Sequence, residues 1–381
     1  MKRRRAVVVD DSAIARHLLH DWLEADGDLE VVGEAADGDQ AIDVITRLRP
    51  NVATIDLRMP GMSGLDLVSY LMAKAPLPIL VLTGEPTRDE AGRAFEAMRR
   101  GALDLLIKPS ALDDEAIRAL RARVRWLATV PVVRHIDSNR LPELPAAAPK
   151  PFATPPGIAP SATGSFPVFK PPAPVPVPPL GPSVVRGVTE PIVVGIAASA
   201  GGPTALANVL GSLPADLPAC LAVVQHLPRG FAPSFVSFLQ SRCPLTVKLG
   251  EHGMVPTAST VVLAPDDHHL EWSDGKFVLV PGPPVEGHRP AGTVLLKSLA
   301  QLGPQAIGVV LSGIGRDGAD GLRAMRDRHA LTIAQDSITS VVYGMPRAAV
   351  EEGAAQQVLP IHEIGRAITA AVVSPWRRRV P

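Results

Sequence analysis

Two stretches of the chain alternate short apolar runs with amphipathic segments, a pattern typical of strands and helices in turn. In the first stretch the apolar runs are Ala6–Val9, Glu30–Glu34, Val52–Ile55, Ile79–Leu82 and Leu103–Ile107. Ser12 follows the first run and is suited to cap the helix after it. This alternation predicts a doubly wound parallel sheet.

The alternation returns after residue 186. Apolar runs at Ile192–Ala198, Cys220–Val224 and Ile307–Leu311 predict three buried strands, and helical patterns follow them. We therefore expect an α/β protein with two doubly wound parallel-sheet domains.

A proline-rich segment separates the two stretches. Residues 142–182 contain 15 prolines in 41 residues, and a chain of this composition is extended and buries no core. We expect a first domain over residues 1–130, a linker over 131–185 and a second domain over 186–381.

Charge and composition narrow the possible partners. Lys plus Arg equals Asp plus Glu at 38 each, so no net field favours nucleic acid or an anionic membrane. No apolar run reaches the roughly 18 residues of a membrane span. Cys220 and Cys243 lie in or near apolar segments, which suits packing in a reducing cytoplasm better than a disulfide. We expect a cytoplasmic protein that binds no nucleic acid and inserts into no membrane.

Five polar residues follow strands of the first domain, namely Asp10, Asp11, Asp56, Thr83 and Lys108. The carboxyl ends of parallel strands meet at one edge of a sheet, so these side chains are expected to lie together. Three crowded carboxylates call for a hard cation such as Mg²⁺. Asp56 could then attack a phosphoryl donor, while Thr83 hydrogen-bonds a phosphoryl oxygen and Lys108 pairs with its charge.

Ser199 stands at the turn between the Ile192–Ala198 strand and a helix. Gly201 and Gly202 allow a tight turn, and Pro203 suits the first turn of the helix. Amides at such a helix start can hold a phosphate, or the oxyanion formed when a serine attacks a carbonyl. The phosphate interpretation is weaker, because the turn has neither the G-x-G-x-x-G pattern nor a P-loop lysine. The hydrolase elbow G-x-S-x-G is only half met.

A histidine and an aspartate take comparable positions. His226 follows the second strand and Asp317 follows the third, so both could meet Ser199 at one sheet edge. His226 would then act as general base, and Asp317 would hold the other ring N–H. Alternatively, His226 is structural and Asp317 caps its own helix. Competing histidines are expected in loops with no equivalent strand end, and these are His252, His268, His269 and His288.

The first domain resembles the receiver domain of two-component response regulators, and this resemblance implies a flavodoxin-like fold. The motifs that carry the resemblance are, in order, Val-Val-Asp-Asp-Ser, Ile-Asp-Leu-Arg-Met-Pro-Gly-Met-Ser-Gly, Leu-Thr-Gly and Lys-Pro-Ser. The resemblance implies that a histidine kinase phosphorylates Asp56, with Mg²⁺ bound by Asp10, Asp11 and Asp56. Leu105 departs from the pattern, because such domains usually carry an aromatic residue there, so the relay from phosphate to surface is expected to differ.

The second domain resembles the catalytic domain of the chemotaxis protein-glutamate methylesterases, the CheB family. Its motifs include Ala-Ser-Ala-Gly-Gly-Pro, Val-Val-Gln-His, Ala-Pro-Asp-Asp-His-His-Leu, Ser-Gly-Ile-Gly-Arg-Asp-Gly-Ala and Ser-Val-Val-Tyr-Gly-Met-Pro-Arg. The resemblance implies a Ser199–His226–Asp317 triad, without a cofactor. That triad would hydrolyse glutamate γ-methyl esters on methyl-accepting chemoreceptors and deamidate certain glutamines.

The resemblance also implies regulation, since the receiver of this family covers the catalytic cleft until its aspartate is phosphorylated. The long linker lowers the effective concentration that holds the domains together. We therefore expect leakier inhibition than with a short tether.

Several residues near the expected site depart from the family. Ile314 replaces a usual methionine, Ser312 replaces a usual threonine, and Ala291-Gly292-Thr293 stands where Ser-x-Asp commonly follows His-Arg-Pro. These departures bear on substrate binding more than on chemistry. They support one alternative, a phosphorylation-dependent interaction module with an inactive esterase domain. A DNA-binding regulator lacks its basic recognition helix here.

Overall fold

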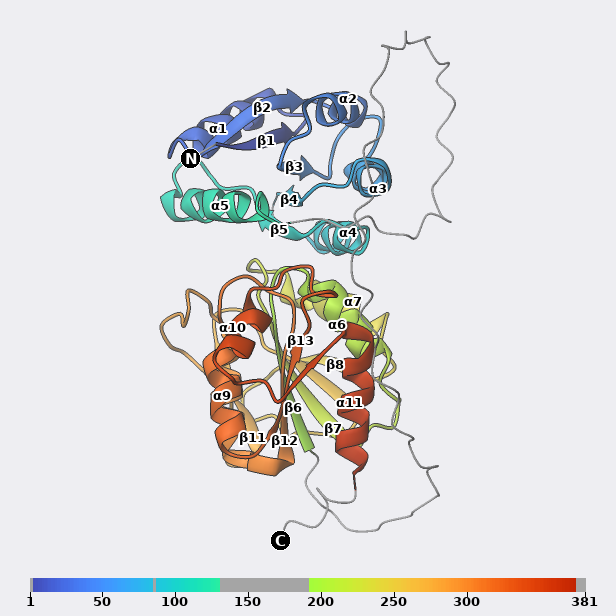
Figure 1. The fold of residues 1–381 in the computed structure, drawn as a ribbon, viewed down its shortest axis with the longest axis vertical. Coiled ribbons are helices and arrows are strands. Elements are labelled where there is room, and N and C mark those ends of the chain that lie inside the picture. Colours follow the sequence, from blue (N-terminus) through green and yellow to red (C-terminus); the bar gives the residue numbers. More distant parts are fainter. Residues whose placement is uncertain (1–2, 85–86, 131–191, 375–381) are drawn as a thin grey trace, which may run out of the picture. The chain divides into compact units, whose positions relative to one another are not determined.

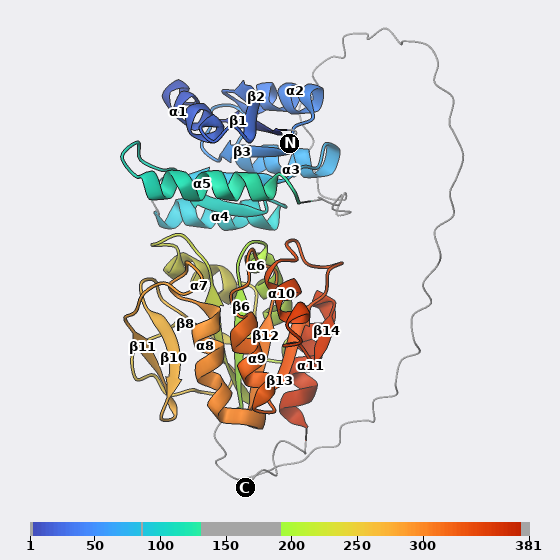
Figure 2. The ribbon, with the colours of Figure 1, turned by 60° about the vertical axis from the view of Figure 1, so that its left-hand side comes forward.

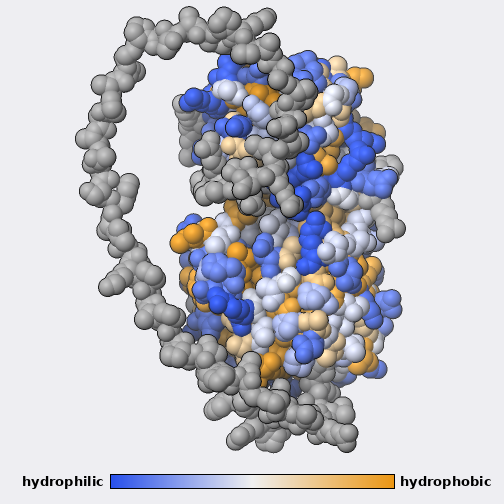
Figure 3. All heavy atoms as spheres, turned by 90° about the vertical axis from the view of Figure 1, so that its right-hand side faces the viewer, coloured by the Kyte–Doolittle hydropathy of each residue, from blue (hydrophilic) through white to orange (hydrophobic). Residues whose placement is uncertain are grey.

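The structure is a computed structural model that describes residues 3–84, 87–130 and 192–374. The linker expected over residues 131–185 lies outside this range. No helix within the described ranges has the length and apolar character needed to cross a bilayer. On the face drawn in Figure 3, hydrophilic and hydrophobic residues are interspersed.

The first domain contains a five-stranded parallel sheet in the order β2-β1-β3-β4-β5 (Figure 1). Its strands are β1 Arg4–Val9, β2 Leu29–Ala35, β3 Val52–Asp56, β4 Ile79–Thr83 and β5 Asp104–Ile107. Its helices are α1 Ala13–Glu24, α2 Gly38–Leu48, α3 Gly64–Lys74, α4 Arg88–Arg99 and α5 Asp114–Leu127. The order is the flavodoxin-like one, so the predicted fold class is confirmed here.

Burial on both faces explains why the strands of this sheet are continuously apolar. In β1, Ala6 and Val8 pack under α1 and α5, whereas Val7 and Val9 pack under the helices of the opposite face. A strand with two buried faces needs apolar residues at every position. Ser12 caps α1 as predicted, because its side chain accepts a hydrogen bond from the N–H of Ala15.

The second domain contains a seven-stranded parallel sheet in the order β14-β13-β12-β6-β7-β9-β8, and a separate antiparallel pair, β10-β11. Its strands are β6 Ile192–Ala198, β7 Ala219–Gln225, β8 Thr246–Leu249, β9 Thr260–Leu263, β10 His269–Ser273, β11 Lys276–Val280, β12 Ala306–Val310, β13 Leu331–Gln335 and β14 Gln357–Leu359. Its helices are α6 Gly202–Gly211, α7 Ala232–Gln240, α8 Gly292–Leu299, the 3-10 helix η1 Ala300–Gln305, α9 Ala319–Asp327, α10 Met345–Glu351 and α11 Ile361–Val373.

Helices cover both faces of this sheet (Figures 1 and 2). One face lies against α6, α7 and α11, and the other against α8, α9, α10 and the β10-β11 pair. The predicted strand Ile192–Ala198 coincides with β6, and the other two predicted strands match β7 and β12 closely. A second doubly wound domain is therefore confirmed. Both cysteines, Cys220 and Cys243, are buried free thiols.

The strand order reverses between β6 and β12. From β6 the chain continues to β7 on one side of the sheet, and it later returns to β12 on the other side. Ligands of open α/β sheets bind beyond the carboxyl ends of the strands at such a switch point. Ala198 pairs with Gln225 of β7, and Ala197 pairs with Val310 of β12, so the three strands end side by side.

Aromatic residues of the two domains pack together within one compact unit that contains both. Phe95 of α4 lies 6.0 Å from Phe231, 5.0 Å from Phe235 and 5.3 Å from Phe238, measured between ring centroids. Phe95, Phe231 and Phe235 are fully buried as a result. The three rings of the second domain lie in and just before α7.

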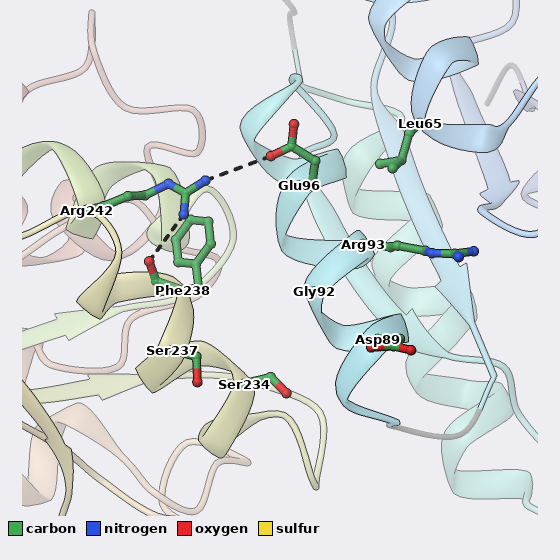
Figure 4. A pocket seen from close by; sticks show the side chains of 9 residues that line it. All are labelled: Leu65, Asp89, Gly92, Arg93, Glu96, Ser234, Ser237, Phe238 and Arg242. Carbon is green, nitrogen blue, oxygen red and sulfur yellow. Dashed lines mark hydrogen bonds and ion pairs between the residues drawn. The ribbon is translucent and has the colours of Figure 1, made fainter.

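A pocket beside these rings is lined by Leu65 of α3, by residues of α4 and by residues in and after α7 (Figure 4). The guanidinium of Arg242 lies 4.1 Å from the centre of the Phe238 ring. It also approaches the carboxylate of Glu96 to 3.8 Å. One cation thus contacts a ring of its own domain and a carboxylate of the other.

Candidate active site

Ser199 occupies the turn from β6 into α6. Gly201 caps the helix in the left-handed conformation, with φ of 72°, and a Cβ there would meet Val341 Cβ at 2.6 Å. The N–H of Ser199 donates to Ser312 O at 3.0 Å, and the N–H of Gly202 donates to Ser199 O at 2.8 Å. The turn is therefore held from both sides, and Ser199 is only 3% exposed.

His226 and Asp317 form a buried pair beside this turn. His226 follows β7, and its backbone N–H donates to Ala198 O at 3.1 Å, which places it next to Ser199. Its Nε2 lies 2.8 Å from Oδ2 of Asp317. Because the carboxylate can only accept, we assign the proton to Nε2, and the lone pair to Nδ1.

The other ring nitrogen of His226, Nδ1, is buried and makes no hydrogen bond among the described residues. No hydrogen bond joins it to Ser199 Oγ among these residues either. The free lone pair on Nδ1 can take up the proton that a serine loses when it attacks a carbonyl.

Asp317 is anchored by the start of another helix. Its Oδ2 accepts from the N–H of Gly292 at 2.6 Å, and its Oδ1 accepts from the N–H of Thr293 at 2.8 Å. It does not cap its own helix, because the N-cap of α9 is Gly318 without a side-chain bond. The alternative that Asp317 serves only as the cap of α9 is therefore wrong.

The pKa of Asp317 follows from these contacts. Burial alone would raise it, but the bond and charge of His226 and the N–H groups of Thr293 and Gly292 outweigh burial, so the pKa lies well below the ordinary value. The carboxylate therefore stays ionised near neutral pH and can stabilise an imidazolium.

The residues that depart from the family have structural roles near the site. Thr293 Oγ1 accepts from the N–H of Gly318 at 2.7 Å, so α8 and the start of α9 hold each other. Gly292 has no room for a side chain, since a Cβ would lie 2.4 Å from Ala197 Cβ. Ser312 Oγ donates to Ala200 O at 2.8 Å and accepts from Val342 N–H at 2.9 Å. These residues support the site and leave Asp317 in place.

The four competing histidines lie in three different settings. His269 begins β10, so the expectation that all four lie away from strands was wrong for this residue. His288 lies in a loop as expected, yet its ring stacks on His226 with centroids 3.6 Å apart and planes 15° apart. His252 and His268 contact backbone carbonyls, of Leu279 and Asp266 respectively.

A carbonyl of the first domain reaches the serine turn. The N–H of Gly201, two residues after Ser199, donates to Leu103 O at 3.1 Å. Next to Leu103, the buried Asp104 pairs with Arg123 at 3.1 Å. Burial raises the pKa of Asp104, while the charges of Arg123 and His226 act against it. An amide beside the serine thus already holds a carbonyl oxygen.

The five polar residues predicted for the first domain meet at the carboxyl edge of its sheet. Lys108 Nζ lies 2.7 Å from Asp10 Oδ2 and 2.5 Å from Asp56 Oδ2. Thr83 ends β4, and its carbonyl accepts from the N–H of Lys108 at 2.8 Å. Burial lowers the pKa of Lys108, but the bonds to Asp10 and Asp56 prevail and raise it.

The residues in this cluster fit a divalent cation. Oxygen atoms of Asp10, Asp11 and Asp56 lie within 4.8 Å of one another. Asp10 Oδ2 forms an ion pair with Lys108 but lacks a hydrogen bond of good geometry. One ammonium cannot neutralise three carboxylates, and Mg²⁺ prefers such oxygen donors.

Sequence reasoning missed the residues that arrange the second site. Gly292 and Thr293 were interpreted as lost substrate contacts, although they hold Asp317. His288 was set aside because no strand leads into it. One signal was present: Gly292, the first residue of α8, is a residue type that permits a close backbone approach.

Comparison with known proteins yields two family matches. Residues 194–368 match the family described as CheB methylesterase, and residues 6–120 match the response regulator receiver domain. Two solved domains of Thermotoga maritima are similar to parts of this chain. The first is its CheB methylesterase catalytic domain, which is 36% identical with a TM-score of 0.46; the match covers 48% of this chain and 98% of that chain. The second is its CheB response regulator domain, which is 32% identical with a TM-score of 0.32; the match covers 34% of this chain and 100% of that chain.

Two curated relatives extend along almost the whole chain. A protein-glutamate methylesterase/protein-glutamine glutaminase of Anaeromyxobacter dehalogenans is 42% identical, and the match covers 96% of each chain. Another, from Pyrococcus abyssi, is 35% identical, and the match covers 97% of this chain and 94% of the relative. The chain therefore belongs to the protein-glutamate methylesterase/protein-glutamine glutaminase family, in which a receiver domain precedes a CheB methylesterase domain.

Proposed function

We propose that this protein is a phosphorylation-activated serine esterase that demethylates glutamate γ-methyl esters on chemoreceptors and deamidates glutamines there. Ser199 is the nucleophile, His226 the general base and Asp317 its partner. The observation that carries the proposal is the buried His226–Asp317 bond of 2.8 Å at the strand switch point beside Ser199. The names of the relatives supply the substrate class.

The reaction proceeds in two acyl-transfer steps. Ser199 Oγ bonds to the ester carbonyl carbon as its proton moves to Nδ1 of His226, and the oxyanion is received by backbone amides, with Gly201 N–H as one donor. The bond to the methoxy group breaks, and methanol leaves with the proton from His226. Water then attacks the acyl-enzyme with His226 again as base, and releases the glutamate carboxylate and Ser199.

The first domain regulates this reaction. We assign the receiver to residues 1–130, the linker to 131–185 and the esterase to 186–381. Leu103 O occupies the N–H of Gly201 and so competes with the substrate oxygen. Phosphorylation of Asp56 by a histidine kinase releases this contact, with Thr83 and Lys108 holding the phosphoryl group. Asp10, Asp11 and Asp56 would hold Mg²⁺, which supplies positive charge for phosphoryl transfer.

The substrate class indicates the pathway and the cellular compartment in which the protein acts. Methyl-accepting chemoreceptors are the protein substrate, and their demethylation gives adaptation in chemotaxis signalling. The free thiols of Cys220 and Cys243 suit the reducing cytoplasm. The esterase needs no cofactor in this mechanism. The alternative of an inactive interaction module loses part of its support, because Gly292 and Thr293 hold Asp317 in place, whereas the departure at Ile314 has no structural explanation.

Covalent labelling tests the nucleophile. The full chain, activated with a small phosphodonor, is treated with a fluorophosphonate, and the modified residue is located by mass spectrometry. We expect one adduct, on Ser199, and none in Ser199→Ala protein that unfolds like the wild type. Labelling at another serine, or at equal rates in His226→Ala protein, would reject the triad.

A further inference from the structure

The general base of the proposed reaction has a second aromatic neighbour. His288 stacks on His226 with ring centroids 3.6 Å apart and planes 15° apart. His226 itself is held at only one edge, because Nε2 bonds to Asp317 and Nδ1 has no partner in the described ranges. A ring held by one in-plane hydrogen bond can still tilt about that bond. A flat neighbour at this distance blocks the tilt.

The loop that carries His288 is built to hold the ring in place. Val285 and His288 exchange both backbone hydrogen bonds, at 3.0 and 2.9 Å, across a two-residue turn. Glu286 and Gly287 at the turn have φ of 52° and 80°, as in the type I′ turn that closes tight hairpins.

A second histidine ties the ends of this loop together. Buried His269 binds Pro283 O through Nε2 at 3.0 Å and accepts from Ala291 N–H through Nδ1 at 3.2 Å. These two bonds attach both ends of the loop to His269, the first residue of β10. The stack on His226 is thus made by a loop whose two ends are hydrogen-bonded to His269.

The charge of the stacked ring matters once His226 takes a proton. Burial, and then the charge of His226, lower the pKa of His288 to about 3, Asp317 opposes this shift and Arg123 adds to it. The charged or titratable groups that act on His288 are therefore His226, Asp317 and Arg123. His288 is neutral at working pH, so it presents an uncharged aromatic face to the imidazolium instead of a second cation.

We propose that His288 is a positioning residue for the esterase: its neutral ring stacks on His226 and keeps Nδ1 of the base directed to the Ser199 hydroxyl. The proposal rests on the proposed function and adds a residue to it. It requires the flat ring of His288 and not its nitrogen atoms.

Two substitutions separate the stack from other roles. His288→Ala removes the ring, and His288→Phe keeps a flat ring of similar size without nitrogen. In the full chain with phosphodonor, we measure the rate and the end point of fluorophosphonate labelling, and kcat and KM for methanol release. The end point counts folded sites, whereas the rate reports the activation of Ser199.

We expect His288→Ala to lower the labelling rate and kcat by about 10-fold to 100-fold, as for a misplaced catalytic group. The labelling end point and KM should stay within about 2-fold. His288→Phe should recover most of the loss. In histidine-labelled protein, the NMR signal that His288→Phe removes should keep its neutral position from about pH 5 to 8.

Several results would overturn the proposal. These are wild-type rates in His288→Ala, a loss confined to the end point, a rise in KM alone, or a Phe variant as slow as the Ala variant. If the wild type neither labels nor releases methanol, the proposed function fails and takes this inference with it. If the wild type is active and His288→Ala has the same labelling rate and kcat, this inference fails and the proposed function stands.

Discussion

Asp317 accepts hydrogen bonds from three groups that come from two distant parts of the sequence. His226 follows β7, and Gly292 and Thr293 begin α8, so one carboxylate joins the base to the scaffold. Such a residue fixes both the tautomer and the direction of the imidazole. At the scale of single residues, Asp317 is therefore the one whose charge matters most besides the reacting groups.

We expect Asp317→Asn to lower kcat by about 10³-fold to 10⁴-fold, because an amide can present an N–H to Nε2 and favour the wrong tautomer. Asp320→Asn is the matched control, since Asp320 is a half-exposed residue that pairs with Arg316. The measurement is methanol release by phosphodonor-activated protein. Activity within about 10-fold of wild type in Asp317→Asn would contradict the role.

The pH dependence of stability gives a second test of the same carboxylate. Its pKa is lower in the folded protein than in the unfolded chain, so its stabilisation is complete above about pH 4, the unfolded value. It is lost as the pH falls through the lower folded value. The difference in unfolding free energy between wild type and Asp317→Asn should be constant from about pH 6 to 8 and shrink below about pH 4. A difference that persists unchanged at low pH would contradict the assignment.

At the scale of elements, α8 and α9 hold each other through their first turns. Asp317, just before α9, accepts from the N–H groups that begin α8, and Thr293 in α8 accepts from the N–H of Gly318 that begins α9. Each helix start has unpaired N–H groups, and each supplies an acceptor to the other. This reciprocal contact brings the aspartate to the histidine.

Thr293 provides a test of the contact with a close control. Thr293→Val keeps the shape but leaves the buried N–H of Gly318 without a partner, so we expect a loss of about 1–3 kcal/mol in the free energy of unfolding. Thr293→Ser keeps the hydroxyl and should lose less. Urea denaturation of both variants measures the difference, and equal stabilities would show that the hydroxyl contributes nothing.

The contacts at these helix starts could not be predicted from the sequence. The five strands of the first domain, three strands of the second domain and the positions of Ser199, His226 and Asp317 follow from apolar runs, because a parallel sheet brings the residues after its strands to one edge. The remaining strands of the second domain, β8 to β11, β13 and β14, were not predicted. No apolar run in the sequence predicts the contacts of Thr293 or the stacking of His288 on His226. They depend on how two helices and a hairpin approach each other, and tertiary packing decides that.

At the scale of the whole molecule, the receiver contacts the esterase through aromatic rings, through backbone carbonyls and through the Glu96–Arg242 ion pair. Phe95 packs against the rings around α7, and Leu103 O binds the N–H of Gly201. The expected switching aromatic is replaced by Leu105, which is buried in β5. The prediction of a different relay remains open to experiment, as does that of leaky inhibition.

Phe95→Asp should weaken the contact, because it places a charge among buried rings. We expect the basal esterase rate of the full chain to rise several-fold toward the phosphorylated rate, while the maximum rate with phosphodonor stays the same. An unchanged basal rate would mean that this interface does not inhibit. The rate of residues 186–381 gives the upper limit, and a full chain that equals it without phosphodonor would reject inhibition altogether.

The most direct measurement of the central claim is the release of labelled methanol from methylated receptor membranes by the full chain. It is made with and without a small phosphodonor, on wild type, Ser199→Ala and Asp56→Asn. We predict that wild type releases methanol faster with phosphodonor, that Asp56→Asn stays at the basal rate and that Ser199→Ala releases none. Release that persists without Ser199, or no release from folded wild type in either condition, would contradict a phosphorylation-activated serine esterase.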